Sequence, residues 1–361
     1  MEARRFRNIS CFFEIARRDR KTSPVPAAYC SDSSRKTVKR IAGLRSFTAF
    51  EPRLARRNGN AIGARMGKVI IVTGASNGFG TKTCKVLAQA GHTVYVSARE
   101  ARSSGQKAED IKTDSDGHGA DLRTIELDTS SDASVNSAVE TIIADNNRLD
   151  VIVHNAGQVV YGPAEAFTPE QLAELYNRNV LGTQRLNRAA LPQLRKQGQG
   201  LLVWVTSSCA RGGSVPFLGA YAASKAALDA LALSYAGELA RWGIETTIVV
   251  PSALGPGHYV GSGRPFDTIR AEDYADGPTA DMSETALSAL AELSPRDPAP
   301  NEVATAIADV VNMPFGQRPL RVYCGPDHDG AAAVDAAADR ARAELLRRIG
   351  LADILKPAMI R

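Results

Sequence analysis

The sequence has few cysteines, few histidines and no long apolar run. Its five cysteines are scattered, without a C-x-x-C pair or any short spacing typical of metal ligands. We therefore expect neither a metal site nor disulfides, and reduced thiols in a cytoplasmic setting are the simplest account. No apolar stretch approaches the roughly 20 residues that span a bilayer, so we predict a soluble protein without a membrane partner.

Positive charge is concentrated at the amino end of the chain. Residues 1–65 hold 16 Lys and Arg against 5 acidic residues, a net charge of +11, whereas the remaining residues carry a net charge of −6. The overall charge of +5 therefore gives no reason to expect that the folded part binds nucleic acid.

Three interpretations of residues 1–65 stay open. The segment lacks a helical or strand period, and its Arg- and Ser-rich composition predicts disorder. The first interpretation is a mitochondrial transit segment, which would be Arg-rich, but Glu2, Glu14 and Asp19 count against it. The second is an arm that binds nucleic acid or a membrane, but the segment lacks the interleaved aromatic and basic residues that would support it. The third interpretation, which we favour, is that the protein starts at Met66, directly before the first apolar run.

From residue 68 onward, short β-branched runs alternate with amphipathic stretches. We expect strands at Val69–Val72, Thr93–Ser97, Leu122–Leu127, Val151–His154, Leu201–Thr206, Glu245–Val250 and Leu320–Tyr323. We expect helices at Thr81–Ala90, Ala133–Ala144, Glu170–Gln197, Tyr221–Trp242 and Ala331–Ile349. This alternation predicts an α/β fold with a doubly wound, Rossmann-like parallel sheet of about seven strands and helices on both faces.

The domain organisation follows from the same pattern. One catalytic domain is expected over residues 66–330, followed by a helical tail over 331–361. The pattern breaks between residues 252 and 300, which are rich in Gly, Pro, Asp and Ser, with a short helix expected near Glu284–Leu293. A long insertion after a strand, on the ligand side of such a sheet, predicts a substrate lid.

A glycine-rich loop separates the first strand from the first helix. Its sequence, residues 73–80, is Thr-Gly-Ala-Ser-Asn-Gly-Phe-Gly. Glycine allows a tight turn and close approach of the backbone, and the N-terminus of the helix presents free N–H groups to a pyrophosphate. The cofactor contacts predicted here are Gly74, Ser76, Asn77, Gly78, Phe79 and Gly80.

The end of the second strand suggests which nicotinamide cofactor is bound. An acidic residue there would bond the ribose 2′-hydroxyl and repel a 2′-phosphate. The strand ends instead in Val96-Ser97-Ala98-Arg99, with a guanidinium placed to bind a phosphate. We therefore predict NADP(H) in preference to NAD(H), although Arg99 is also explained as an ordinary solvated charge.

Tyr221 and Lys225 predict proton transfer at a carbonyl or alcohol oxygen. A phenol has a reference pKa of about 10, and a nearby ammonium favours its ionised form. Positions i and i+4 lie on one face of a helix, so Lys225 should lie beside the Tyr221 ring. Ser208, thirteen residues upstream, would hold the same substrate oxygen from a strand end.

The combination of motifs resembles the short-chain dehydrogenase/reductase family from Lys68 to about Tyr323. The match rests on Thr-Gly-x-x-x-Gly-x-Gly at 73–80 and on Asn155-Ala156-Gly157, Asn179, Ser208 and Tyr221-x-x-x-Lys225. Each motif is weak alone, and their order and spacing make the resemblance strong.

The resemblance implies a role for each of these residues. Tyr221 would be the general acid/base, Lys225 would bind the nicotinamide ribose and support the tyrosine charge, and Ser208 would position the substrate oxygen. Asn179 would hold a water for a proton relay. Asp128 would contact the adenine, unless it caps the following helix. The backbone of Asn155, Ala156 and Gly157 would run beside the adenosine part.

Two positions depart from the family pattern. His154 replaces the first of two Asn residues, which we expect to alter strand packing rather than chemistry. The sixth strand ends in Pro251-Ser252, where the family has Pro-Gly followed shortly by a Thr near the carboxamide. Orientation of the carboxamide must then use the backbone or Ser252, which puts the rate of turnover in doubt more than cofactor binding.

These features together predict an NADP(H)-dependent oxidoreductase that interconverts a carbonyl compound and an alcohol, with a small-molecule substrate of unknown identity. Because of the altered strand end, a cofactor-binding sensor or scaffold with little catalysis is the alternative. The resemblance also implies a homodimer or homotetramer formed through the helices at Glu170–Gln197 and Tyr221–Trp242.

Overall fold

The computed structural model describes residues 67–75, 78–99, 121–213, 215–252, 262–293, 299–325 and 330–358. The expectation of a disordered extension over residues 1–65 lies outside these ranges. So do the predicted contacts of Ser76 and Asn77.

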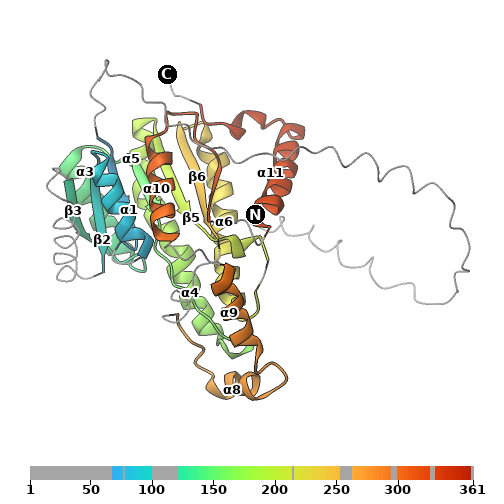
Figure 1. Cartoon of the computed structure of the whole chain (residues 1–361). Coiled ribbons are helices and arrows are strands. Elements are labelled where there is room, and N and C mark those ends of the chain that lie inside the picture. The colour runs from blue at the N-terminus through green and yellow to red at the C-terminus, as the bar shows by residue number, and fades with distance from the viewer. Residues whose placement is uncertain are drawn as a thin grey trace, which may run out of the picture. The chain divides into compact units, whose positions relative to one another are not determined.

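A seven-stranded parallel sheet forms the centre of the fold (Figure 1). The spatial order is β3-β2-β1-β4-β5-β6-β7, and every neighbouring pair is parallel. The strands are β1 (Val69–Val72), β2 (Thr93–Ala98), β3 (Asp121–Glu126), β4 (Val151–His154), β5 (Gly200–Val205), β6 (Ile244–Pro251) and β7 (Arg321–Cys324). The predicted doubly wound sheet of seven strands is confirmed.

Alternate residues of each strand enter different cores, as the twofold period of a strand requires. Val69 and Ile71 of β1 join the core that also holds α3 (Asp132–Asn146), α5 (Gly182–Gln197) and α6 (Gly219–Ala240). Ile70 and Val72 join the core with α1 (Gly78–Gln89) and α10 (Ala299–Asn312). The strands are apolar on both sides because helices cover both faces.

The expected helix over Glu170–Gln197 is interrupted. Thr168 caps its start with a reciprocal capping box, and Pro169 is its first residue, as predicted. The helix α4 (Pro169–Tyr176) then passes through a π-helical turn, η3 (Asn177–Leu181), before α5 begins. A π-turn inserts one residue into the helical repeat and often marks a functional site. No local sequence pattern predicts this turn.

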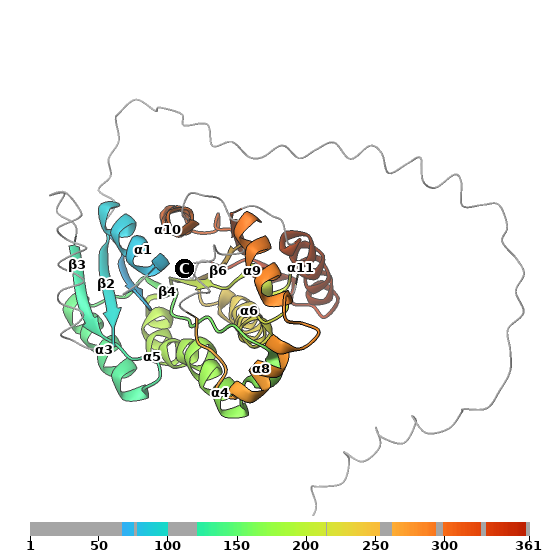
Figure 2. The same ribbon diagram turned by 60° about the horizontal axis from the view of Figure 1, so that its bottom comes forward.

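The insertion holds α9 (Met282–Leu293), the short helix expected near Glu284–Leu293, and α8 (Thr268–Asp276), which was not predicted. α10, which begins at Ala299 at the end of the insertion, was not predicted either. α8 lies beside α4, and α9 lies near α6 (Figures 1 and 2). A bridge between Val160 and Gly263 joins the insertion to the loop after β4, and the Tyr161 hydroxyl donates to the main-chain oxygen of Ser283 at 3.3 Å.

The carboxyl-terminal segment forms a helix, as expected, and packs on the domain. α11 (Ala331–Arg348) contacts the short helical turn η4 (Ser208–Ala210), and the turn η5 (Ala352–Leu355) contacts α6. Within the parts of the chain that the structure describes, no helix has the length and apolar character needed to cross a membrane.

Candidate active site

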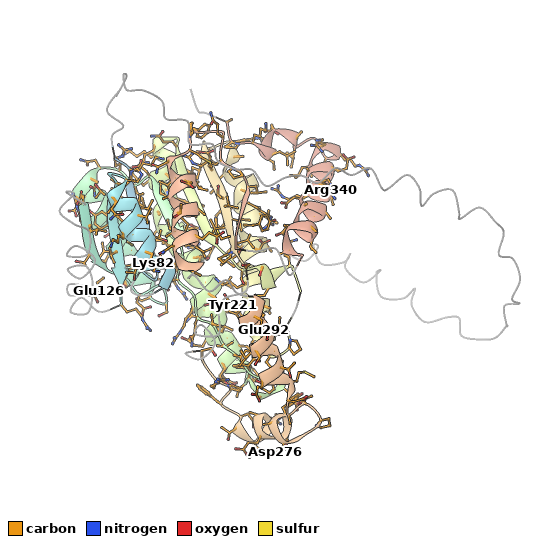
Figure 3. All side chains as sticks on the ribbon, viewed as in Figure 1. Lys82, Glu126, Tyr221, Asp276, Glu292 and Arg340 are labelled. Carbon is orange, nitrogen blue, oxygen red and sulfur yellow. The ribbon has the colours of Figure 1, made fainter. Side chains whose placement is uncertain are left out.

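The predicted functional residues gather at the carboxyl edge of the sheet. In a parallel sheet the loops after all strands emerge at one edge, and ligands bind where the strand order reverses. That reversal lies between β1 and β4. The loop after β1 and the first turn of α1 hold the glycines, the segment after β4 holds Asn155 to Gly157, and the segment after β5 holds Ser208. In Figure 3, Tyr221 lies between the sheet and α9.

The glycine-rich loop is packed too closely for side chains at two positions. A Cβ atom on Gly74 would lie 2.7 Å from the Cα atom of Ala156, and one on Gly80 would lie 2.4 Å from the main-chain oxygen of Gly74. Gly78 has a φ of 56° and open space around it. α1 starts at this glycine without an acidic residue in its first turn. Phe79 packs against the core below. The loop and helix end therefore suit a bound pyrophosphate.

Hydrogen bonds of Thr73 and Asn155 hold this loop at the end of β4. The Thr73 hydroxyl accepts hydrogen bonds from the main-chain nitrogens of Asn155 and Ala156, both at 3.0 Å. In return, the Asn155 amide donates to the main-chain oxygens of Thr73 at 2.9 Å and Gly74 at 3.1 Å. The two loops flanking the switch point thus form one rigid unit. The role of the Thr73 hydroxyl was missed from the sequence, where a threonine at a strand end gives no special signal.

Tyr221 and Lys225 lie together, one turn apart on α6. The Lys225 Nζ atom is 5.8 Å from the centre of the Tyr221 ring and donates to the main-chain oxygen of Val205 at 2.9 Å. Both side chains are buried. Burial lowers the pKa of Lys225 to about 8, against a smaller opposing effect of Cys209. The lysine is thus held against the phenol ring as the helical spacing predicts.

Ser208 begins η4 at the end of β5 and is buried. Its main-chain oxygen accepts hydrogen bonds from the nitrogens of Arg211 at 3.2 Å and Gly212 at 2.7 Å, which close the turn. The adjacent Ser207 side chain instead accepts from the Cys209 thiol at 3.2 Å. The structure thus gives the two neighbouring serines different surroundings.

Asn179 occupies the middle of the π-turn and is fully buried. Its amide oxygen accepts from the Gln158 nitrogen at 2.8 Å, and its amide nitrogen donates to the Gln158 main-chain oxygen and to the Ser224 hydroxyl, both at 3.0 Å. Both amide hydrogens therefore have protein acceptors. Any water at this residue would be held by the main chain of the turn rather than by the amide nitrogen.

Arg99 and Asp128 lie on neighbouring strand ends. Arg99 follows β2 and is exposed. Asp128 follows β3, and its carboxylate accepts from the side chain of Ser130 at 2.7 Å and from the main chain of Ser130 at 2.9 Å. These hydrogen bonds lower the pKa of Asp128, and the positive charges of Arg99 and Arg178 add to the effect. Asp128 is not the helix cap, because Ser131 caps α3.

The end of β6 is described as far as Ser252. Pro251 pairs with Cys324 of β7, and the Ser252 nitrogen donates to the Cys324 oxygen at 2.8 Å. The Ser252 hydroxyl lies against Gly325, where an added Cβ atom would come within 2.1 Å of the oxygen. The altered residue thus packs on the neighbouring strand end.

His154 points into the core under the site, as expected for a packing residue. It is buried, its Nε2 lies 2.8 Å from the Asn187 amide oxygen, and its ring is 4.5 Å from the Trp204 ring. Burial lowers its pKa to about 4, with the Asn187 contact opposing the shift. The imidazole is therefore neutral near pH 7.

Apolar side chains surround Tyr221 on the side of the insertion. The same buried cluster includes Tyr161, Leu218 and, from α9, Leu290. Phe217 packs against the cluster, with its ring 5.8 Å from that of Tyr161. Its φ of 68° lies in the left-handed region that bulky residues avoid. Sequence inspection missed this residue, since nothing in its local pattern signals a strained backbone.

Comparison with known proteins shows the family to which the chain is similar. The family model described as short chain dehydrogenase matches residues 68–258. A 3-ketodihydrosphingosine reductase from Bacteroides thetaiotaomicron is 31% identical over 211 residues, which cover 58% of this chain and 72% of that protein. The crystal structure of a short-chain dehydrogenase from Streptomyces avermitilis has 29% identity and a TM-score of 0.60, covering 78% of this chain and 97% of that one.

An alcohol dehydrogenase from the archaeon Thermococcus sibiricus, solved with 5-hydroxy-NADP, has the same fold at 23% identity and a TM-score of 0.57, covering 73% of this chain and 97% of that one. The fold and the site define a dinucleotide-binding oxidoreductase of the Rossmann type. The chain belongs to the short-chain dehydrogenase family, which acts on alcohol and carbonyl groups. The family predicted from the motifs, and the enzyme class with it, are confirmed.

Proposed function

We propose that this protein is an NADP(H)-dependent oxidoreductase that interconverts a carbonyl compound and an alcohol, with Tyr221 as the general acid/base. The observation that carries the proposal is the buried Lys225 ammonium, 5.8 Å from the centre of the Tyr221 ring and fixed by the Val205 carbonyl. A fixed positive charge stabilises the phenolate that forms when the tyrosine gives up its proton.

A bound nicotinamide would supply or accept the hydride. Gly74, Gly80 and the start of α1 would hold its pyrophosphate, and Asn155 to Gly157 would line the adenosine part. During reduction, Tyr221 donates its proton to the substrate oxygen while Ser208 hydrogen-bonds the same oxygen. Asn179 fixes the π-turn, whose main chain would hold the water that reprotonates the tyrosine through Lys225.

Arg99 supports NADP(H) as the preferred cofactor. It is exposed directly after β2, whose own residues, Thr93–Ala98, include no carboxylate, and its positive charge lowers the pKa of Asp128 on the next strand end. A guanidinium binds phosphate through paired N–H groups. We propose that Arg99 binds the 2′-phosphate and that Asp128 lies near the adenine. Pro251 and Ser252 would then orient the carboxamide through the main chain.

The surroundings of Tyr221 support an apolar substrate. Tyr161, Phe217, Leu218 and Leu290 form an apolar wall next to the proposed acid. The insertion that supplies Leu290 would act as the lid. Each buried methylene contributes about 0.8 kcal/mol, so kcat/KM should rise about threefold to fourfold per methylene along a series of ketones until the site is filled. The Bacteroides relative is named as the reductase of a 3-keto compound, which supports reduction as the physiological direction.

The experiment that tests the proposal is NADPH oxidation over a panel of carbonyl compounds with Tyr221→Phe and Tyr235→Phe. Loss of the proton donor should lower kcat by about 10² to 10⁴ in Tyr221→Phe. Tyr235 lies on the same helix, but its hydroxyl donates to Gln184 at 2.7 Å, so Tyr235→Phe should keep its activity. Full activity of Tyr221→Phe would rule out the assigned acid.

The sensor or scaffold alternative has one observation in its favour, the packing of Ser252 against Gly325 at the altered strand end. A protein of that kind would bind NADPH, measured by fluorescence quenching, without turning over any member of the panel. Turnover of even one carbonyl compound at an ordinary rate would exclude it.

A homo-oligomer is supported by the exposed surface of α5 and α6. A hollow of about 440 Å³ is lined there by Leu191, Arg195, Tyr235, Glu238 and Trp242, among others. Trp242 is 47% exposed, with the Arg195 guanidinium 5.6 Å from its ring centre. We propose that a second copy covers this face. Sedimentation equilibrium of the full chain and of Trp242→Glu tests it: a dimer that dissociates in the variant supports the interface.

A further inference from the structure

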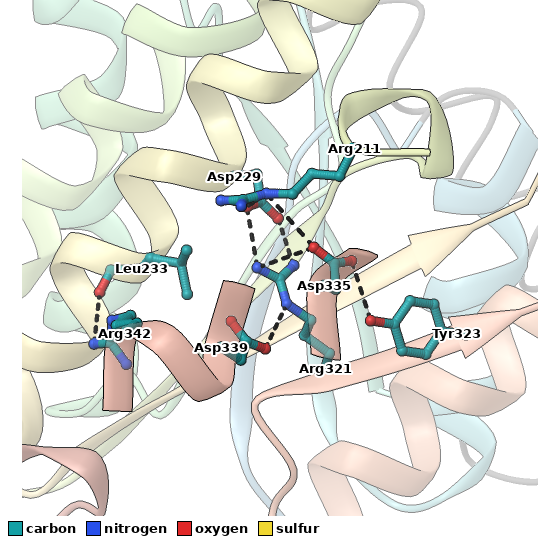
Figure 4. A network of polar contacts seen from close by, with 8 residues as sticks. All are labelled: Arg211, Asp229, Leu233, Arg321, Tyr323, Asp335, Asp339 and Arg342. Atoms are coloured by element: carbon teal, nitrogen blue, oxygen red, sulfur yellow. Dashed lines mark hydrogen bonds and ion pairs between the residues drawn. The ribbon is translucent and has the colours of Figure 1, made fainter. Parts of the chain in front are cut away.

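A buried ionic cluster lies behind the proposed active site. It consists of Arg211, Asp229, Arg321, Asp335 and Asp339, and we refer to it as the Arg321 cluster (Figure 4). The Arg321 guanidinium donates to the two carboxylate oxygens of Asp229 at 2.5 and 3.1 Å and, through Nε, to Asp339 at 3.0 Å.

Three of the five charged groups of this cluster are almost fully removed from water, and Arg211 and Asp339 are partly exposed. The side chains of Asp229 and Asp335 are 2% exposed and that of Arg321 is 5% exposed. A buried charge is strongly unfavourable when it lacks a partner, and a buried pair requires close geometry. The cluster therefore fixes the elements that carry it relative to one another, namely α6, β7, α11 and the residue that follows η4.

Arg211 connects the cluster to Ser208. It follows η4 directly, and its main-chain nitrogen donates to the Ser208 oxygen at 3.2 Å. Its guanidinium donates to Asp229 at 2.9 Å. Asp229 lies one turn after Lys225 on α6, the helix that also carries Tyr221. The turn that holds Ser208 is thus tied by its own arginine to the helix of the tyrosine and lysine.

Asp335 of α11 lies between the two arginines. Its Oδ1 atom is 3.5 Å from Arg211 Nε and 3.6 Å from Arg321 Nη2. Its other oxygen accepts from the Tyr323 hydroxyl at 3.1 Å. Both guanidiniums also share Asp229, so without Asp335 they would repel each other at this shared carboxylate, with Asp339 beside Arg321 alone. Asp335 lies beyond the residues that the family model matches.

We propose that Asp335 is a positioning residue, which acts through Arg211 to hold the Ser208 turn against the helix of Tyr221 and Lys225. The inference rests on the proposed function, because it takes Ser208 as the group that holds the substrate oxygen. The carboxyl-terminal helix α11 is then part of the catalytic machinery rather than an independent tail. A small displacement of Ser208 is enough to slow the reaction, since catalysis depends on distances within a fraction of an ångström.

The test compares Asp335→Asn with a matched control, Glu245→Gln, in the full chain. Glu245 forms a second buried ion pair with Arg318, and its side chain is 3% exposed. It lies at the start of β6, the end away from the site. Both variants should lower Tm. Asp335→Asn should also lower kcat about tenfold and leave the Kd for NADPH within twofold, whereas Glu245→Gln should keep kcat. An unchanged kcat in Asp335→Asn would overturn the proposal.

A double-mutant cycle with Ser208→Ala identifies the route of the effect. If Asp335 acts through Ser208, the double variant should be no slower than Ser208→Ala alone, within about twofold. A further tenfold loss in the double variant overturns the positioning role and leaves the role of Ser208 intact. Full activity of Ser208→Ala overturns the role of Ser208 in the proposed function, and the positioning role with it.

Arg211→Gln provides a second test of the proposal if Asp335→Asn does not fold. The Arg211 side chain is 27% exposed, so its loss leaves the cluster less disturbed. The same tenfold fall in kcat is expected, again without further loss when combined with Ser208→Ala. A wild-type kcat in Arg211→Gln would contradict the proposal.

Discussion

Gly157 lies directly against the ammonium of Lys225. A Cβ atom at position 157 would be 3.3 Å from the Lys225 Nζ atom and 3.7 Å from the Asn179 amide oxygen. Since Nζ is also bound to the Val205 carbonyl, it has little room to move away. Gly157 therefore leaves space for the Lys225 side chain. This role is separate from the predicted place of Gly157 beside the cofactor.

We expect Gly157→Ala to lower kcat about threefold to tenfold, because the added methyl moves the lysine by a few tenths of an ångström from the tyrosine it supports. Steady-state reduction of one ketone at saturating NADPH measures the effect. Gly219→Ala is the control on the helix of Tyr221: its Cβ atom would meet only the Ala164 Cβ, at an ordinary 3.8 Å. Equal losses in the two variants would refute the contact with Lys225.

The pH dependence of reduction should reflect the buried lysine. Burial lowers the pKa of Lys225 to about 8, so its ammonium is charged below that pH and neutral above it. A neutral amine no longer stabilises the phenolate that forms as Tyr221 gives up its proton. We therefore expect kcat/KM for the ketone, at saturating NADPH, to fall as pH rises through about 8.

The matching variant is Lys225→Met, which removes the titrating group and keeps an apolar chain of similar length. Its residual activity should be low, and the decline near pH 8 should be absent. A decline at the same pH in both proteins would assign the titration to another group.

Much of this fold could be predicted from local patterns. The strands are short β-branched runs because both faces of the sheet are covered, as Ile70 and Ile71 show by entering opposite cores. Tyr221 and Lys225 meet because helical spacing alone determines which residues share a face. α10 could also have been predicted locally, because Val303, Ile307 and Val310 are spaced for one buried face of a helix. The helix was not predicted because it adjoins the irregular insertion.

The remaining features depend on contacts between segments distant in sequence. The π-turn at Asn179 forms where the amide meets Gln158 and Ser224, and no local pattern encodes those partners. Likewise, Arg211 and Asp335 are ordinary charged residues in the sequence. Only the fold makes them neighbours in a buried cluster.

The cofactor preference should depend on Arg99. We expect Arg99→Ala to lower kcat/KM for NADPH about tenfold to a hundredfold and to leave that for NADH nearly unchanged, because a hydrogen bond between charged groups contributes about 1.5 to 3 kcal/mol. Arg340→Ala, at an exposed position on α11, controls for general loss of positive charge. Parallel losses with the two cofactors would mean that Arg99 does not bind the 2′-phosphate.

His154 should make the protein sensitive to acid. Its pKa is about 4 in the folded chain, against an ordinary value of 6.5, because burial disfavours the charged ring. The unfolded chain therefore takes up a proton between these values and the folded chain does not. The stability from this residue is fully present above pH 6.5 and is lost as pH falls toward 4.

Replacing His154 with Asn, the residue usual in the family, removes this titration. Urea unfolding at pH 7.5 and pH 4.5 should show that His154→Asn loses about 2.5 kcal/mol less stability over this interval than the unaltered protein does. Comparing the change with pH, rather than the stability at one pH, cancels any packing difference beside Trp204, since that difference is present at both pH values. Parallel losses in the two proteins would show that the imidazole does not remain neutral in the fold and that other groups cause the acid sensitivity.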